Sequence, residues 1–168
     1  GFSWLGIQTM FVYMFAYVQF SIPSLPDVEM GKVVAMSFLI LNAVGAILPV
    51  LVLKPLTEKF GRVMTHGVAI LTMALGYAGI YFFGQSEVSI YAFMVILGIG
   101  WASTISLPFA IMSQDIKQHQ MGTFMGLFNL SVVLPQLVAS LGVGIVISQA
   151  TDKSVTFAIC ATSLLISG

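Results

Sequence analysis

Long apolar runs separated by short polar stretches fill the chain. A transmembrane helix needs about 20 mainly apolar residues to cross about 30 Å of hydrocarbon. Six runs reach or approach that length: residues 1–22, 33–53, 63–83, 88–113, 122–148 and 154–168. Only Gly84 to Glu87 connect the third and fourth runs, so these two helices must be antiparallel neighbours. The pattern predicts an all-α membrane protein with six transmembrane helices.

The composition supports a membrane-embedded chain and argues against a soluble one. Of the 168 residues, 58% are hydrophobic and only 7% are charged, and the mean hydropathy is +1.04. Soluble domains carry about 25% charged residues. The Lys, Arg, Asp and Glu residues all fall in the connections between the runs or at the edges of the runs. The formal net charge is zero, so we expect no nucleic-acid partner.

The basic residues predict an orientation in the membrane. They divide between two groups of connections, with Lys54, Lys59, Arg62 and Lys117 after the second and fourth runs and Lys32 and Lys153 after the others. Short loops rich in Lys and Arg stay in the cytoplasm. The excess therefore places the second and fourth connections on the cytoplasmic side.

The first two predicted helices carry amide side chains inside membrane sequence. In the first, two amides and three aromatic residues share one helical face: Trp4, Gln8, Phe11, Phe15 and Gln19. In the second, Asn42 lies near the same face as Gly45 and Pro49. Hydrocarbon tolerates polar groups only where protein or water receives them. These amides therefore either line a solute cavity or form hydrogen bonds in helix packing.

The fourth predicted helix places Trp101, Thr104 and Pro108 on one face. Tryptophan is enriched at the membrane interface, whereas Trp101 lies in the middle of its run. It is either a core aromatic residue or a stacking platform for a sugar ring, whose C–H face suits an aromatic surface. In the second case Thr104 would line the same site.

The fifth predicted helix places Gly122, Asn129, Gln136 and Ser140 on one face. Each of the two amides brings donors and an acceptor, as the recognition of hydroxyl groups requires. The alternative is hydrogen bonding between helices.

A weak internal symmetry relates the second and fifth predicted helices. The second has Asn42 and Pro49 seven residues apart, and the fifth has Asn129 and Pro135 six residues apart. Each is the middle helix of a group of three. We therefore expect two inverted three-helix repeats, residues 1–83 and 88–168.

Nothing in the sequence has the pattern of an enzyme or a metal centre. The two histidines, His66 and His119, are far apart and lack the spacing of metal ligands. The only cysteine, Cys160, lies in an apolar run. We expect no catalytic residue, no metal and no cofactor.

The connection Leu56-Thr-Glu-Lys-Phe-Gly-Arg62 resembles the signature between the second and third helices of each half of a Major Facilitator Superfamily transporter. That signature has an acidic residue, a basic residue and then Gly-Arg, and Glu58, Lys59, Gly61 and Arg62 fill these places. We expect them to form a conformational latch that pairs charges across helix ends. The alternative is surface charge that only signals topology. Inverted three-helix repeats build each half of such a transporter.

Other stretches resemble one branch of this superfamily, the sucrose-transporter-like members of the glycoside–pentoside–hexuronide:cation symporters. Phe2-Ser-Trp-Leu5, with Met10 and Tyr13, is similar to their seventh helix. Their tenth and eleventh helices are resembled by Gly100-Trp-Ala-Ser103, Ser106-Leu-Pro-Phe-Ala110, Met121-Gly-Thr-Phe-Met-Gly126, Phe128-Asn129 and Leu134-Pro-Gln136. The resemblance implies that residues 1–168 are the C-terminal six helices of a twelve-helix transporter, with its N-terminal half missing from this chain.

The resemblance also implies a function. We expect alternating access and uptake of a sugar or glycoside, with a proton as the coupled ion, in the plasma membrane. The residues expected to line the substrate site are Gln8, Asn42, Trp101, Thr104, Asn129 and Gln136. No carboxylate lies inside a predicted span, so coupling cannot be assigned to this chain and uniport stays open. Two alternatives remain: a sensor or scaffold that carries no solute, and a transporter of another solute such as a nucleoside or folate.

Overall fold

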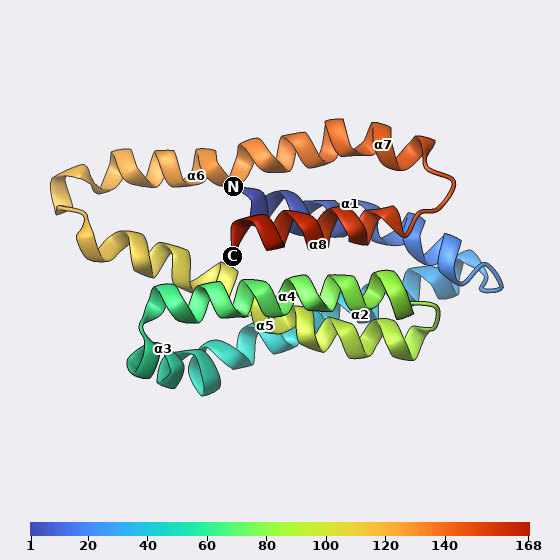
Figure 1. Ribbon diagram of the computed structural model, residues 1–168, viewed down its shortest axis with the longest axis horizontal. Coiled ribbons are helices and arrows are strands. Elements are labelled where there is room, and N and C mark those ends of the chain that lie inside the picture. Colours follow the sequence, from blue (N-terminus) through green and yellow to red (C-terminus); the bar gives the residue numbers. More distant parts are fainter.

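The chain folds into a bundle of helices, and all six predicted segments are helical. The computed structural model describes the backbone of residues 1–168 and every side chain except those of Asp115 and Gln118. The elements are α1 (Phe2–Ser21), α2 (Asp27–Leu48), the π-helical segment η1 (Pro49–Leu53), α3 (Lys54–Phe60), α4 (Arg62–Phe83), α5 (Glu87–Asp115), the 3₁₀ turn η2 (Gln118–Gln120), α6 (Met121–Leu137), the π-helical segment η3 (Val138–Val143), α7 (Gly144–Gln149) and α8 (Val155–Ser167). Figure 1 shows the long helices running side by side along one long axis.

Four helical rods are long and apolar enough to cross a membrane: Asp27–Phe60, Arg62–Phe83, Glu87–Gln114 and Met121–Gln149. The 13-residue helix α8 is apolar but shorter. The 20-residue helix α1 has no charged residue, yet its two glutamines and two tyrosines lower its hydropathy. The prediction of six spans is therefore supported for four by length and composition, while α1 and α8 pack inside the same bundle.

The helix connections gather at two ends of the bundle. The α3–α4 and α5–α6 junctions lie together at one end, and the other three connections lie at the opposite end (Figure 1). This arrangement confirms the division of the basic residues into two groups. Which end faces the cytoplasm remains a prediction.

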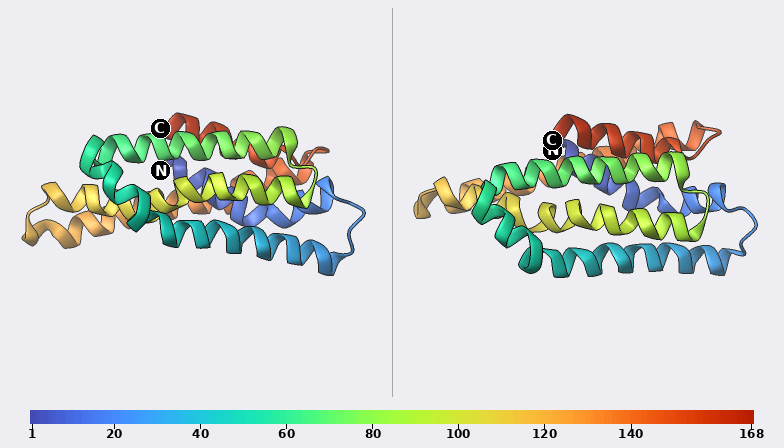
Figure 2. Two further views of the ribbon diagram at one scale, coloured as in Figure 1. Left: turned by 90° about the horizontal axis from the view of Figure 1, so that it is seen from below. Right: turned by 60° about the horizontal axis from the view of Figure 1, so that its bottom comes forward.

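The prediction was wrong for residues 54–60, which it treated as part of a loop. These residues form helix α3, which follows α2 and η1 without a break. Pro55 has no N–H, so it leaves one gap in the hydrogen-bond ladder of this continuous rod, two residues after the π-helical segment. The rod bends on the way, and α3 turns from the axis of α2 toward α4 (Figure 2). Gly61 then ends α3 with a φ of +83°, a conformation that favours glycine.

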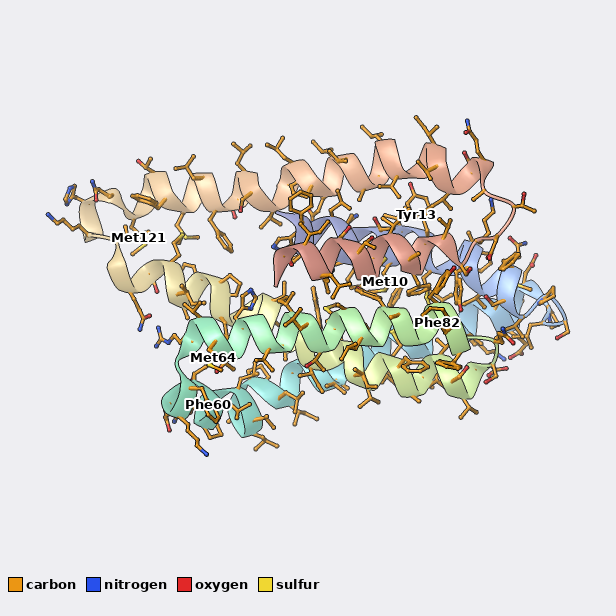
Figure 3. The ribbon with its side chains drawn as sticks, in the orientation of Figure 1. Met10, Tyr13, Phe60, Met64, Phe82 and Met121 are labelled. Carbon is orange, nitrogen blue, oxygen red and sulfur yellow. The ribbon has the colours of Figure 1, made fainter. Side chains whose placement is uncertain are left out.

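The core lies where α1, α4, α5 and α8 meet. Met10, Met73, Met94 and Phe157 contribute one fully buried side chain from each of these four helices. Tyr17 adds a polar bridge, because its hydroxyl donates to the carbonyls of Ile80 (3.0 Å) and Gly84 (2.9 Å) at the end of α4. Large apolar side chains also cover the outside of the bundle, as a hydrocarbon environment requires (Figure 3).

Candidate functional site

Two predicted site residues from different helices contact each other. The indole Nε1 of Trp101 on α5 donates to Oδ1 of Asn42 on α2, at 3.2 Å. Trp4 and Phe11, both on α1, meet the Trp101 ring edge to face, at centroid distances of 6.2 and 5.5 Å. Phe38 lies 4.9 Å from Phe11. We call Trp4, Phe11, Phe38, Asn42 and Trp101 the tryptophan cluster.

A close approach of α2 and α5 holds the tryptophan cluster together. A Cβ on Gly45 would lie 2.6 Å from Cδ1 of Trp101, so the ring rests against the backbone of α2. One turn earlier on α5, a Cβ on Gly98 would lie 2.5 Å from that of Val44. The small residues let the two helices approach. Gly45 therefore marks a close contact between α2 and α5.

The Asn42 amide is oriented and still accessible. Its Nδ2 donates to the carbonyl of Phe38 at 2.8 Å, which fixes the amide so that Oδ1 faces Trp101. Asn42 is exposed and Trp101 is half-buried. One amide hydrogen and a lone pair of the oxygen therefore remain for a ligand. The cluster presents aromatic surface with one polar group in a membrane span.

The other two candidate residues on these helices, Gln8 on α1 and Thr104 on α5, have different surroundings. Gln8 is half-buried between Trp4 and Phe11 on α1 and makes no side-chain hydrogen bond with the described residues. Thr104 is 3% exposed, and its hydroxyl donates to the carbonyl of Gly100 at 2.8 Å. Gln8 therefore adjoins the tryptophan cluster, whereas the Thr104 hydroxyl is satisfied by its own helix.

The two amides of α6 stand apart from the tryptophan cluster. Asn129 is exposed and Gln136 is half-buried, and no hydrogen bond among the described residues joins either one to the cluster. The rod α6–η3–α7 packs against α1. The Tyr13 hydroxyl on α1 donates to the carbonyls of Ala139 (3.3 Å) and Ser140 (3.0 Å) in η3. The structure therefore separates the predicted site into two groups.

The expected latch residues lie at the junction of α3 and α4. Glu58 and Lys59 are exposed on α3, and Gly61 forms the turn. The Arg62 Nη1 donates to the carbonyl of Ala110 on α5, at 2.8 Å. Among the described residues one ion pair forms, between Lys32 and Glu29, and it lies at the opposite end of the bundle. In this conformation Arg62 joins α4 to α5 through a backbone carbonyl, and the charge-pairing latch stays a prediction.

Sequence reasoning missed two contributions to these sites. Phe38 lies four residues before Asn42, so the i, i+4 spacing could have placed its ring and carbonyl beside the amide. His66 is half-buried in α4, and its Nδ1 shares a 2.8 Å hydrogen bond with the hydroxyl of Ser103 on α5. No sequence signal pairs these two residues.

The chain is similar to known transporters. A profile of the Major Facilitator Superfamily matches residues 1–142. The sucrose transport protein SUT2 of Oryza sativa subsp. japonica is 30% identical over 125 residues, and SUC4 of Arabidopsis thaliana is 27% identical over 124. Each alignment covers 63% of this chain but only 25% and 24% of the relative. The chain thus spans about a quarter of the length of the curated relatives it matches. No solved structure matches the chain.

A bundle of long apolar helices, with an aromatic and amide cluster inside the spans, defines an integral multi-pass membrane protein. The family match covers most of the chain, and the chain belongs to the Major Facilitator Superfamily. This confirms the family resemblance and the all-α membrane fold of a half-transporter. It also places the chain with membrane transporters and not with enzymes.

Proposed function

We propose that this chain forms half of a secondary transporter that carries a sugar or glycoside across the membrane by alternating access. It would act with an N-terminal half of the same transporter, and the plasma membrane is the expected location. The sucrose transport proteins among its relatives support a sugar as the substrate class. The expected inverted repeats are supported by the two middle rods, since each contains a proline and a π-helical segment.

The observation that carries this proposal is the accessible Asn42 amide beside the Trp101 ring. A sugar presents C–H faces and a rim of hydroxyl groups. The first suits the half-buried indole and the second suits an amide that keeps hydrogen-bonding capacity. Gln8 extends this wall from α1. Asn129 and Gln136 would complete the site from α6 when the rod moves toward the cluster.

Uptake of labelled sucrose in cells or proteoliposomes tests the site. We expect Trp101→Ala and Asn129→Ala to reduce uptake by about three- to tenfold or more, because each removes groups worth roughly one hydrogen bond or a stacking contact. Surface expression should persist. Phe83→Ala and Gln85→Ala are matched controls, because both residues are exposed at the far end of α4. Unchanged uptake in both site variants would remove the assignment.

The same assay separates this function from the alternatives. A sensor or scaffold would bind sugar in proteoliposomes without carrying it across the bilayer. A transporter of another solute, such as a nucleoside or folate, would carry that solute while sucrose fails to compete. Net sucrose flux into sealed vesicles supports the proposal, and its absence with a folded protein contradicts it.

Proton coupling is the second part of the proposal. Among the described residues, the acidic side chains stand at or near helix ends and none lies in the middle of a span. The coupling group would therefore belong to the other half of the transporter. Collapse of a pH gradient should reduce the accumulation of sucrose. Uptake that does not depend on the gradient would instead indicate uniport.

The α3–α4 junction is proposed to act as the latch. Arg62 supports this role because it already joins α4 to α5, and Glu58 and Lys59 stand one helix earlier at the same end. Arg62→Ala should change the balance of inward- and outward-open states, measured by cysteine accessibility. Arg62→Lys keeps the charge but loses the planar fork, so it should recover the balance only in part. Identical accessibility in all three proteins contradicts the latch.

A further inference from the structure

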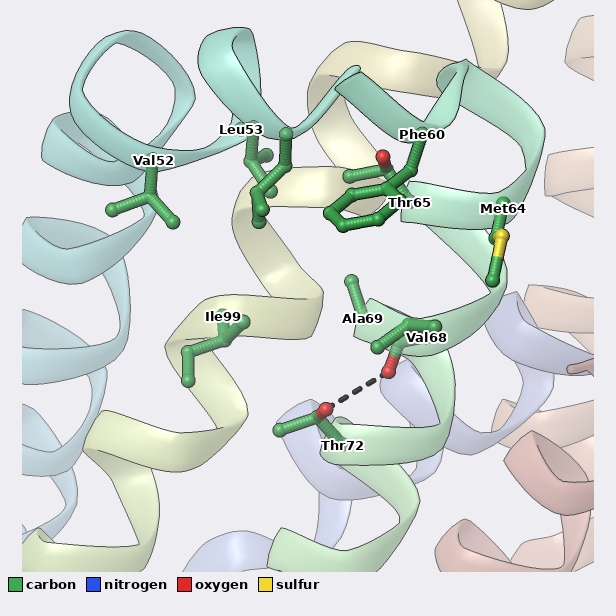
Figure 4. A pocket seen from close by; sticks show the side chains of 10 residues that line it. Val52, Leu53, Phe60, Met64, Thr65, Val68, Ala69, Thr72 and Ile99 are labelled. Carbon is green, nitrogen blue, oxygen red and sulfur yellow. Dashed lines mark hydrogen bonds between the residues drawn. The ribbon is translucent and has the colours of Figure 1, made fainter. Parts of the chain in front are cut away.

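An apolar groove opens beside the α3–α4 junction. It lies between η1 and α3 on one side and α4 on the other, with Ile99 of α5 at its base, and has a volume of about 240 Å³ (Figure 4). The groove exists because α3 turns from the axis of α2 after the π-helical segment. Its lining is formed by Val52, Leu53, Leu56, Phe60, Met64, Thr65, Val68, Ala69, Thr72 and Ile99.

The groove offers its occupant almost no polar contact. Among the described residues that line it, two have polar side chains, and both are threonines whose hydroxyls are satisfied by their own helix. Thr65 donates to the carbonyl of Gly61 at 2.7 Å and Thr72 to that of Val68 at 2.8 Å. A sugar or a water molecule would leave its hydrogen bonds unmade there. The groove therefore fits a hydrocarbon chain.

The rim of the groove faces outward from the bundle. Phe60, Met64 and Val68 are 48%, 61% and 56% exposed. From Met64 to Thr72 the lining follows α4 for about 12 Å, at 1.5 Å per residue. One leaflet of a bilayer has about 15 Å of hydrocarbon, half of the usual 30 Å. The groove thus lies where an acyl chain of one leaflet can enter it.

Basic side chains lie at the end of the groove that is nearest to the α3–α4 junction. Lys54 and Lys59 are exposed on α3, and neither forms an ion pair with a described residue. The Lys59 Nζ lies 5.0 Å from the ring centroid of Phe60, which lines the groove. Arg62 adds a third cation, against one acidic side chain, Glu58. A phosphate beside α3 would meet these cations while its acyl chain fills the groove.

We infer that this groove binds one acyl chain of an anionic phospholipid, whose phosphate group is held by Lys54 and Lys59. The inference depends on the membrane location of the chain and not on which solute it carries. Juxtamembrane cations attract anionic lipid by about fivefold per residue. The two lysines should therefore set a preference for phosphatidylglycerol over phosphatidylcholine, and the apolar lining should set the affinity that the two lipids share.

Native mass spectrometry of the purified full-length transporter, titrated with each lipid, tests both parts. The double variant Lys54→Gln/Lys59→Gln should weaken phosphatidylglycerol binding by at least about tenfold and leave phosphatidylcholine binding nearly unchanged. Val68→Trp places an indole at the exposed rim and should weaken binding of both lipids. Lys32→Gln and Val88→Trp are matched controls at the opposite end of the bundle, and both should bind like the wild type.

The wild-type protein alone can overturn the inference. Equal retention of phosphatidylglycerol and phosphatidylcholine would contradict the role of the lysines, even if a variant failed to fold. Unchanged binding in Val68→Trp would contradict the groove as the position of the chain. Transport activity of the wild type is measured separately, so loss of the lipid preference and loss of sugar flux are distinguishable.

Discussion

The second and fifth predicted spans are built alike but held differently. The rods Asp27–Phe60 and Met121–Gln149 each contain a proline and a π-helical segment. The first packs closely on α5, where the Trp101 ring rests on Gly45. The second packs against α1, and in the described residues Tyr13 makes both side-chain hydrogen bonds that reach it from another helix.

This difference indicates that the two rods have different roles in the proposed site. The tightly packed rod carries Asn42, whose amide is already oriented beside the indole. The sparsely held rod carries Asn129 and Gln136, which make no hydrogen bond to that wall in this conformation. Alternating access needs a site with parts that rearrange. We expect α2 and α5 to form the fixed wall and α6 to supply the movable wall.

The largest expected effect comes from filling the contact of the fixed wall. In Gly45→Leu the new side chain would begin 2.6 Å from the Trp101 ring, so the ring or the helix must shift. Overpacking of this kind costs about 1–3 kcal/mol. Thermal unfolding followed by size-exclusion chromatography should show a lower melting temperature. Gly31→Leu is the matched control on α2, because no atom lies within 4 Å of its added Cβ. Equal melting temperatures would show that α2 and α5 are not closely packed.

A smaller effect is expected from releasing the movable wall. Tyr13→Phe removes the hydroxyl that donates to Ala139 and Ser140, at a cost of roughly 0.5–1.5 kcal/mol. Hydrogen exchange should become faster in residues 138–149 and stay unchanged in α2. Tyr81→Phe is the control, since the Tyr81 hydroxyl makes no hydrogen bond among the described residues. Faster exchange throughout the bundle would contradict a local anchor.

The smallest effect on stability distinguishes the two asparagines. Asn42→Ala should destabilise the protein by about 1 kcal/mol, because it breaks the bonds with Trp101 and Phe38. Asn129→Ala should change the free energy of unfolding by no more than about 0.5 kcal/mol, because that side chain is exposed. Thermal unfolding measures both, and the same preparations serve the uptake assay. If Asn129→Ala destabilises as much as Asn42→Ala, α6 is not a loosely held wall.

The sequence predicted the helices well because hydrophobic length is a strong signal in membrane proteins. It failed at residues 54–60, since an apolar run ends at the first charged residue while a helix need not. Lys, Leu and Glu all favour helix, and the rod continues through Pro55 although that residue has no N–H to donate.

The candidate site was predictable as residues but not as contacts. Asn42 is a polar amide in an apolar run, and Trp101 is a tryptophan in the middle of a run and not at the membrane interface. These departures from the usual pattern sufficed to select both residues. Their pairing depends on how α2 crosses α5, and no spacing along the chain contains that information. Thr104 shares a face with Trp101 on a helical wheel, yet its hydroxyl bonds within its own helix. The helical wheel therefore did not show how the Thr104 hydroxyl is bonded, and its role in the site stays a prediction.

The π-helical segments change how positions along these rods should be compared. A π turn joins residues five apart and so holds one residue more than an α turn, which rotates all later side chains by about 100°. The residues of α7 follow η3, so they do not keep the α-helical register of Asn129 and Gln136 on α6. Deleting one residue from Val138–Val143 would restore the α register and turn α7 against α6. A single-residue gap in this segment of a related protein would then indicate that the side chains of α7 point in another direction, and not simply that the rod is shorter.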